Sequence, residues 1–209
     1  VDVDPDTFCI DPASIRKAIT PKTKAIVPVH LYGHTAPMEE IMEIANRRGI
    51  PVIEDNAQAI GADYRYKNGE SKKAGTIGTI GCTSFFPSKN LGCYGDGGAI
   101  FTNDEALANR LKMIANHGQS KRYYHDLVGC NSRLDSIQAA VLNVKLKRLD
   151  DYIAARRKAA DFYDKAFAGH SKITTPFRAS YGNHVFHQYT LLLEGVDRDG
   201  LNAYLAESS

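Results

Sequence analysis

Two residues that could do chemistry each follow a short apolar stretch of the sequence. Asp55 ends the run that begins at Pro51, and Lys89 comes three residues after the run Gly81 to Phe86. Ligands of open parallel sheets bind beyond the carboxyl ends of the strands, so both side chains would reach one region. A carboxylate and a lysine amine in that region suit a cofactor that has both a cationic ring nitrogen and an aldehyde.

Pyridoxal 5′-phosphate (PLP) fits this description. Its aldehyde forms a Schiff base with a lysine, and its pyridinium needs an acidic partner to act as an electron sink. Taken singly, a lysine in a loop is usually a solvated charge, and an aspartate after a strand is usually a cap or turn former. The hypothesis therefore depends on Asp55 and Lys89 occurring together.

The elements that would position these residues form a βαβ unit. Residues 25–29 are a short apolar run typical of a buried strand, and residues 37–48 have apolar side chains at helical spacing. Gly49 follows as the expected end of that helix, and residues 51–55 form a second apolar run. A strand, a crossover helix and another buried strand predict a parallel sheet.

The rest of the chain predicts further elements and a domain boundary. Residues 80–86 and 98–102 read as strands, and Asp104 caps a helix to about His117, whose inward residues are Leu107, Leu111 and Ile114. Residues 134–167 predict one long helix of about 50 Å. Residues 184–193 alternate like a strand. We expect a large-domain portion over 1–150, a linking helix over 151–169, and a smaller domain that starts over 170–209.

Composition excludes several classes of protein. The chain has 209 residues, with 43% hydrophobic and 24% charged, which is typical of a globular protein. A formal net charge of +2 gives no reason to expect nucleic-acid or membrane binding. No two of the four cysteines have a CxxC spacing, so no zinc or thioredoxin-type site is predicted, and scattered thiols favour the reducing cytoplasm. Both ends look like internal points of a longer protein.

Six stretches carry a resemblance to one family. They are residues 28–33, 53–58, 84–92, 95–99, 116–118 and 131–135. In order and spacing they resemble the nucleotide-sugar aminotransferases of the DegT/StrS type. The resemblance covers about residues 1–165 and weakens over 170–209, where His187-Gln188-Tyr189 resembles a strand of the second domain. It implies an α/β protein of PLP fold type I, with a mainly parallel sheet flanked by helices and the start of a smaller C-terminal α+β domain.

The resemblance also implies roles for particular residues. Lys89 matches the lysine that bonds to PLP and then moves the substrate proton, and Asp55 matches the aspartate at the ring nitrogen. Gln58 matches a glutamine beside the cofactor ring. Ser84 and Asn131 match residues that reach the cofactor phosphate, Asn131 in the neighbouring subunit. Lys89 also excludes the family's dehydratases, which carry His there.

Two assignments are less direct. Arg133 is placed for a substrate carboxylate or phosphate, because a guanidinium pairs with either through two hydrogen bonds. His30 lies at a strand end, where a place near the cofactor and a place in the core are both open.

The implied activity is PLP-dependent transfer of an amino group from L-glutamate to a nucleotide-linked keto-sugar, by a homodimer with shared active sites, for amino-sugar and polysaccharide biosynthesis. The alternative from another class is a non-catalytic regulatory or binding relative. It is disfavoured because Lys89, Asp55, Gln58 and Ser84 occur together. A nicotinamide-dependent oxidoreductase is also disfavoured, because the glycines at 95, 97 and 98 do not open a helix in a βαβ unit.

Overall fold

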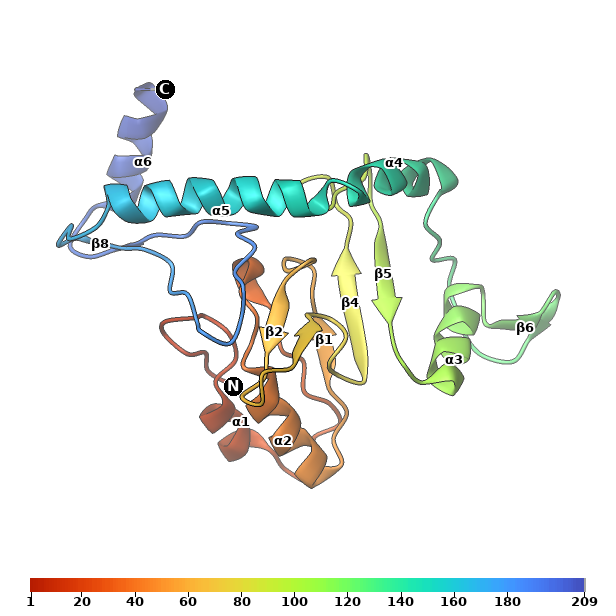
Figure 1. Cartoon of the computed structure of the whole chain (residues 1–209). Helices are drawn as coiled ribbons and strands as arrows, with labels where there is room; N and C mark the ends of the chain where they lie inside the picture. Colours follow the sequence, from red (N-terminus) through yellow and green to blue (C-terminus); the bar gives the residue numbers. More distant parts are fainter. Residues whose placement is uncertain (209) are drawn as a thin grey trace.

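A computed structural model describes residues 1–208 (Figure 1). Its central sheet has the order β1 (Ile53–Asp55), β4 (Ile80–Ser84), β5 (Gly98–Phe101), with β1 parallel to β4 and β4 antiparallel to β5. Residues 25–29 run parallel beside β1 through the bridges Ile26 to Val52 and Val29 to Asp55. The predicted α/β class is therefore confirmed, with a sheet that is parallel in part.

The helix of the βαβ unit forms as predicted. Helix α2 (Met38–Arg48) buries Met38, Ile41, Ile44 and Ala45. Gly49 ends it in the left-handed conformation, at φ 62°, and its N–H bonds back to the carbonyls of the last turn. A shorter helix, α1 (Pro12–Ala18), packs near α2 and is capped by the side chain of Asp11.

Helix α3 (Glu105–Ala115) confirms the predicted cap but corrects the predicted packing. The Asp104 side chain accepts a hydrogen bond from the Leu107 N–H, as an N-cap should. However, no residue of α3 is buried, and Ile114 is 37% exposed. Of the three residues predicted to face inward, Leu111 lines an open hollow beside β5 instead of a filled core.

The single long helix predicted over 134–167 is wrong. The structure has α4 (Ser136–Leu146) and α5 (Leu149–Ala166), separated by a turn at 147–148. Packing explains the break: Leu149 and Ile153 turn into the core beneath Gly61, while the Lys145 ammonium bonds to the Gly92 carbonyl. Helical periodicity continues across the turn, so the sequence does not reveal it.

The strand predicted over 184–193 is also corrected. Only β9 (Leu192–Leu193) is a strand, paired with β8 (Ile173–Thr174), and helix α6 (Arg198–Glu207) follows. Residues 184–188 are instead an irregular segment, with Phe186 at φ 46°, that returns to the first half of the chain, where the Val185 N–H donates to the Gly33 carbonyl (2.9 Å).

Two buried histidines join the chain's first half to its C-terminal part. The ring of His34 meets that of His184 edge-on, and the His184 ring stacks on Phe186 at 3.9 Å between centroids. The Ala179 N–H donates to His34 Nε2 (3.2 Å), and the Phe186 N–H donates to His184 Nδ1 (3.0 Å). Both rings therefore use a ring nitrogen as an acceptor.

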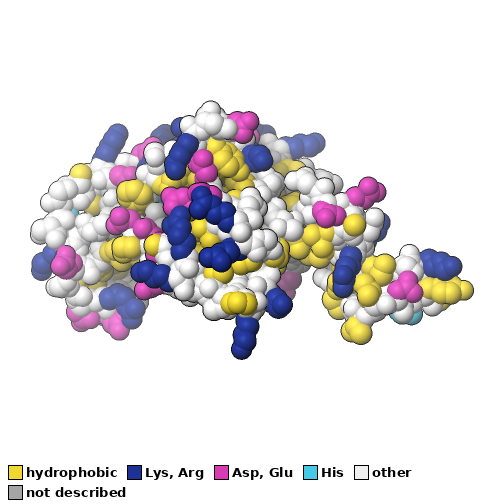
Figure 2. All heavy atoms as spheres, turned by 90° about the horizontal axis from the view of Figure 1, so that it is seen from below, with side chains coloured by type: hydrophobic (Ala, Val, Ile, Leu, Met, Phe, Trp, Pro, Cys, Tyr) yellow, Lys and Arg dark blue, Asp and Glu magenta, His cyan; other side chains and the backbone are white. Residues whose placement is uncertain are grey.

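Two small hairpins lie outside the central sheet. The first pairs β2 (Asp63–Arg65) with β3 (Ser71–Lys73), and the second pairs β6 (Gln119–Lys121) with β7 (Tyr124–His125). The β6–β7 hairpin is an arm that projects from the body of the molecule, visible as a separate lobe in Figure 2. Apolar side chains in the hairpin and just after it are open to solvent: Tyr123 is 75% exposed, and Val128, three residues beyond β7, is 97% exposed. Within residues 1–208, no helix is long and apolar enough to cross a membrane.

Candidate active site

Asp55 lies where β1 ends. The strand register sets it beside Cys82 of β4, two residues before β4 ends at Ser84. One carboxylate oxygen, Oδ1, accepts a hydrogen bond from the Ala57 N–H (3.0 Å). No partner within the described chain engages Oδ2, so the half-buried carboxylate keeps one oxygen for a ligand.

The residue before Asp55 anchors this strand end. Glu54 is fully buried, and its carboxylate accepts hydrogen bonds from His30 Nε2 and Gly75 N–H at 2.8 Å each, and from the N–H groups of Ile77 and Gly78. Burial alone raises the pKa of a carboxyl, but these donors outweigh it and hold the pKa of Glu54 below its usual value.

The tautomer of His30 follows from the same contacts. His30 Nδ1 accepts from the Ala36 N–H (3.0 Å), so the proton of the neutral ring lies on Nε2 and points at Glu54. His30 is 0% exposed. Of the two places open to it from the sequence, the structure gives it the one in the core.

Lys89 lies in the turn that follows β4. Its N–H donates to the Phe86 carbonyl (2.9 Å), and the Phe86 N–H donates to Ser84 Oγ (3.2 Å), so Ser84 keeps its own hydroxyl proton to donate. Lys89 is half-buried, and no hydrogen bond or ion pair within residues 1–208 holds its Nζ. The amine is therefore available to an aldehyde.

Gln58 holds the turn that follows residues 25–29, which run beside β1. Its Oε1 accepts from the Tyr32 N–H (2.6 Å), which leaves its amide NH₂ as a donor. Tyr32 lies in η1 (Leu31–Gly33), a short turn with Tyr32 at φ 58°. Gln58 thus has a structural bond on one side and a free donor on the other.

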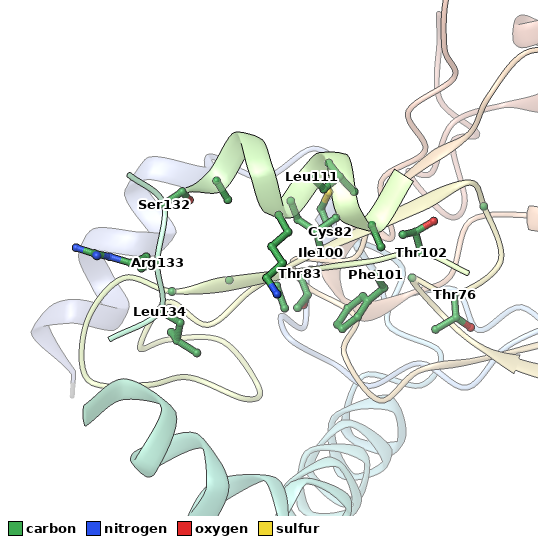
Figure 3. Close-up of a pocket in the computed structure, with 18 of the residues that line it drawn as sticks. Thr76, Cys82, Thr83, Ile100, Phe101, Thr102, Leu111, Ser132, Arg133 and Leu134 are labelled. Atoms are coloured by element: carbon green, nitrogen blue, oxygen red, sulfur yellow. The ribbon is translucent and has the colours of Figure 1, made fainter. Parts of the chain in front are cut away.

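Asn131 and Arg133 do not lie with these residues. They line the hollow of about 1210 Å³ between β5, α3 and the 131–134 loop (Figure 3), and Asp55, Gln58, Ser84 and Lys89 are absent from its walls. Both are exposed, and the Arg133 side chain points away from β5 and α3. Within this chain, the structure separates the predicted site into two groups.

Three residues in or around segment 184–188 carry no role predicted from the sequence. Asn90, 5% exposed, donates from Nδ2 to the Val185 carbonyl (3.0 Å), and Arg156 donates to the carbonyls of Phe186 and His187 (3.0 and 3.2 Å). His187 itself is half-buried. In the sequence, the only indication is that Asn90 directly follows Lys89. Hydrogen bonds between residues 95 positions apart leave no trace in local spacing.

The residues present fit PLP on chemical grounds. The group needs an amine, a carboxylate for its ring nitrogen and donors for its oxygens. Lys89 and Asp55 offer the first two with uncommitted atoms, and Gln58 and Ser84 keep free donors. A metal is not suggested by the described residues, which contain no group of three or more His, Cys, Asp or Glu placed to hold one.

Comparison with known proteins defines the class. The model of the DegT/DnrJ/EryC1/StrS aminotransferase family matches residues 1–209. The chain belongs to this family. A solved structure from Streptomyces venezuelae, DesV in complex with a ketimine intermediate, is 42% identical with a TM-score of 0.92, and the match covers 100% of this chain and 54% of that one. The fold expected from the resemblance is confirmed.

Two curated proteins are similar to this chain over nearly its whole length. The "pleiotropic regulatory protein" of Geobacillus stearothermophilus is 52% identical over 99% of this chain and 54% of its own length. The UDP-2-acetamido-2-deoxy-3-oxo-D-glucuronate aminotransferase of Pseudomonas aeruginosa is 49% identical over 98% of this chain and 55% of its own length. The chain spans about half the length of the curated relatives it matches.

Proposed function

We propose that the full-length protein is a PLP-dependent aminotransferase that moves an amino group from L-glutamate to a keto-sugar linked to a nucleoside diphosphate. The observation that carries this proposal is the placement of Asp55 and Lys89 after two neighbouring parallel strands, each with an uncommitted functional atom. Family membership and the names of the relatives support it. Its product would supply amino-sugars for polysaccharide biosynthesis.

When bound, PLP supplies an aldehyde that exchanges amino groups and a ring that accepts electrons from the substrate carbon. Asp55 holds the proton on the ring nitrogen through the oxygen that Ala57 leaves free. Ser84 and Gln58 donate to the phosphate and ring oxygen: Ser84 Oγ keeps its proton while it accepts from the Phe86 N–H, and the Gln58 NH₂ is free while its Oε1 accepts from the Tyr32 N–H. Lys89 Nζ takes the proton from the α-carbon of glutamate, so it must pass through a neutral form.

The choice of sugar falls to residues outside the Lys89 group. A guanidinium pairs with a carboxylate through two parallel hydrogen bonds, so Arg133 favours either a uronic acid or the side-chain carboxylate of glutamate. The Pseudomonas relative named for a 3-oxo-glucuronate makes the UDP-linked keto-uronate the first substrate to test. A panel of UDP-, dTDP- and GDP-linked keto-sugars would identify the preference.

We propose further that the enzyme is a homodimer whose subunits share their active sites. Asn131 and Arg133 lie apart from Lys89 in one subunit, and they follow an arm whose apolar side chains are exposed. A partner subunit would cover the arm and receive both residues. We also propose that a domain boundary lies at about residue 150 and that the protein works in the reducing cytoplasm. The four free cysteines support this location.

Spectroscopy and turnover test the proposed activity together. Full-length protein should bind PLP with visible absorbance that bleaches on addition of L-glutamate, and should aminate a keto-sugar nucleotide. Lys89→Ala should fold but lose both signals, and the matched control Lys72→Ala, on the exposed β3, should keep them. Activity that survives in Lys89→Ala would remove this lysine from the mechanism.

A regulatory role is the second candidate, because a relative 52% identical is named as a regulatory protein. A protein that takes up PLP and glutamate without aminating any keto-sugar in the panel would favour that role. Turnover with one of them would exclude a purely non-catalytic function.

Mixing two inactive variants tests the shared site. Lys89→Ala and Asn131→Ala subunits each lack one part, so a mixed dimer regains one complete site if the sites are shared. Random pairing predicts recovery of about a quarter of wild-type activity. If activity stays absent after verified subunit exchange, Asn131 does not serve the neighbouring subunit.

A further inference from the structure

The irregular segment 184–188 is held beside Lys89 at three points, which we call the clasp: Gly33, Asn90 and Arg156. The Gly33 carbonyl accepts from the Val185 N–H, Asn90 Nδ2 donates to the Val185 carbonyl, and Arg156 donates to the carbonyls of Phe186 and His187. Close approach reinforces these bonds, since a Cβ at Gly33 would lie 2.9 Å from the backbone nitrogens of Phe186 and His187. The clasp therefore fixes the backbone of His187.

His187 carries an unsatisfied polar atom in this fixed position. Its Nδ1 is buried and finds no hydrogen-bond partner among the described residues. Such atoms are uncommon in native proteins and indicate a missing water or ligand group. This atom can therefore form a hydrogen bond with a polar group that enters the site.

The charges around His187 keep its ring neutral. Burial lowers its pKa, and the positive charges of Lys89, from the loop after β4, and Arg156, from α5, lower it further. The η1 turn meets this segment through backbone atoms of Gly33 and Tyr32. A neutral imidazole has one ring nitrogen that accepts a hydrogen bond.

Lys89 is the mobile neighbour that could supply the donor. Its Nζ has no partner within residues 1–208, and a lysine side chain carries three donors on a flexible four-carbon stem. In the proposed reaction this amine must be released from the cofactor and then held ready to take a proton. Without a hydrogen-bond partner, the amine would spend part of its time in rotamers that point away from the substrate.

We propose that His187 is a further positioning residue of this site, whose neutral imidazole accepts a hydrogen bond from the Lys89 amine once that amine is free. The proposal rests on the proposed function for its purpose. The contact itself is a property of the protein without cofactor, so it can be measured separately.

The first measurement is the pH at which Lys89 becomes reactive. Cofactor-free, full-length protein is acetylated with dilute acetic anhydride over a range of pH, and labelling of Lys89 is followed by peptide mass spectrometry. A hydrogen bond to the ammonium stabilises its charged form, so His187→Leu should lower the labelling midpoint by about one pH unit. His187→Asn, which keeps an acceptor near the position of Nδ1, should restore it, and the exposed-site control His170→Leu should leave it unchanged.

The second measurement needs no change at His187. In NMR titrations of the cofactor-free protein, Lys89→Met should raise the pKa of His187, because it removes a neighbouring positive charge. If His187→Leu folds and its Lys89 midpoint equals that of wild type, the proposal is wrong. If His187→Leu does not fold, an unchanged His187 titration in Lys89→Met refutes it instead.

These outcomes separate this proposal from the proposed function. A protein in which Lys89 and His187 are coupled but no keto-sugar is aminated would contradict the proposed function alone. An active aminotransferase in which they titrate independently would contradict the positioning role alone.

Discussion

Replacing Glu54 by Gln should destabilise the protein far more than its single-atom change suggests. The two carboxylate oxygens of Glu54 accept four hydrogen bonds, two on each oxygen, from His30 Nε2 and the N–H groups of Gly75, Ile77 and Gly78. In the variant one oxygen becomes an NH₂ group. Whichever way the amide is turned, two buried N–H donors then face another donor.

The magnitude follows from these two donors. A buried donor left unsatisfied costs about 1–3 kcal/mol, so two such donors together cost about 2–6 kcal/mol. His30 cannot relieve the conflict by moving its proton, because Nδ1 already accepts from the Ala36 N–H. We therefore expect Glu54→Gln to lower the free energy of unfolding by about 2–6 kcal/mol.

Urea unfolding of the full-length protein, followed by circular dichroism, measures this loss. The matched control is Glu43→Gln, which removes an exposed pair with Arg47 and should change stability by less than about 0.5 kcal/mol. The pKa of Glu54 lies below its ordinary value of 4.5, so the carboxylate stabilises fully above that pH and loses its effect as pH falls through the folded-state pKa. The deficit of the variant should thus be constant from pH 6 to 8 and shrink in acid. A loss below about 1 kcal/mol at pH 7 would refute this account of the pair.

Three further predictions follow from other contacts. Asp55→Asn should retain PLP but lose most of the transamination rate, because a neutral amide cannot hold the ring nitrogen protonated; near wild-type turnover would exclude the pairing. Gly33→Ala should destabilise by at least about 1–3 kcal/mol more than Gly69→Ala, since both glycines have positive φ but only Gly33 has backbone atoms at 2.9 Å from the new Cβ; equal losses would mean that segment 184–188 is not pressed on Gly33. Burial lowers the pKa of His34 to about 4 and that of His184 to about 3, so the unfolded chain, near 6.5, takes up protons first as pH falls. The free energy of unfolding should therefore drop by about 1.5 kcal/mol for each histidine between pH 6.5 and 5. Urea midpoints should fall less steeply with pH in His184→Gln, and as steeply as in the wild type in the control His170→Gln.

The sequence by itself determined the local elements and the strand-end residues. The helix that ends at Gly49, the Asp104 cap and the strands before Asp55 and Lys89 all depend on spacing and capping within a few residues, and all appear in the structure. The family resemblance rests on the same short stretches, so it was equally visible. The roles predicted for Lys89, Asp55, Gln58, Ser84, Asn131 and Arg133 remain predictions for the experiments above.

Only the tertiary structure decided which of these residues share a neighbourhood. Periodicity ran unbroken through 147–148, but the burial of Leu149 and Ile153 splits that helix in two. Alternation over 184–193 predicted a strand, but the segment bonds to Gly33, Asn90 and Arg156 instead of to a sheet. The sequence leaves the place of His30 open, and the contact between its Nε2 and Glu54 decides it. Each of these outcomes depends on contacts between residues far apart in the chain, and their energies of a few kcal/mol override local preference without leaving a local pattern.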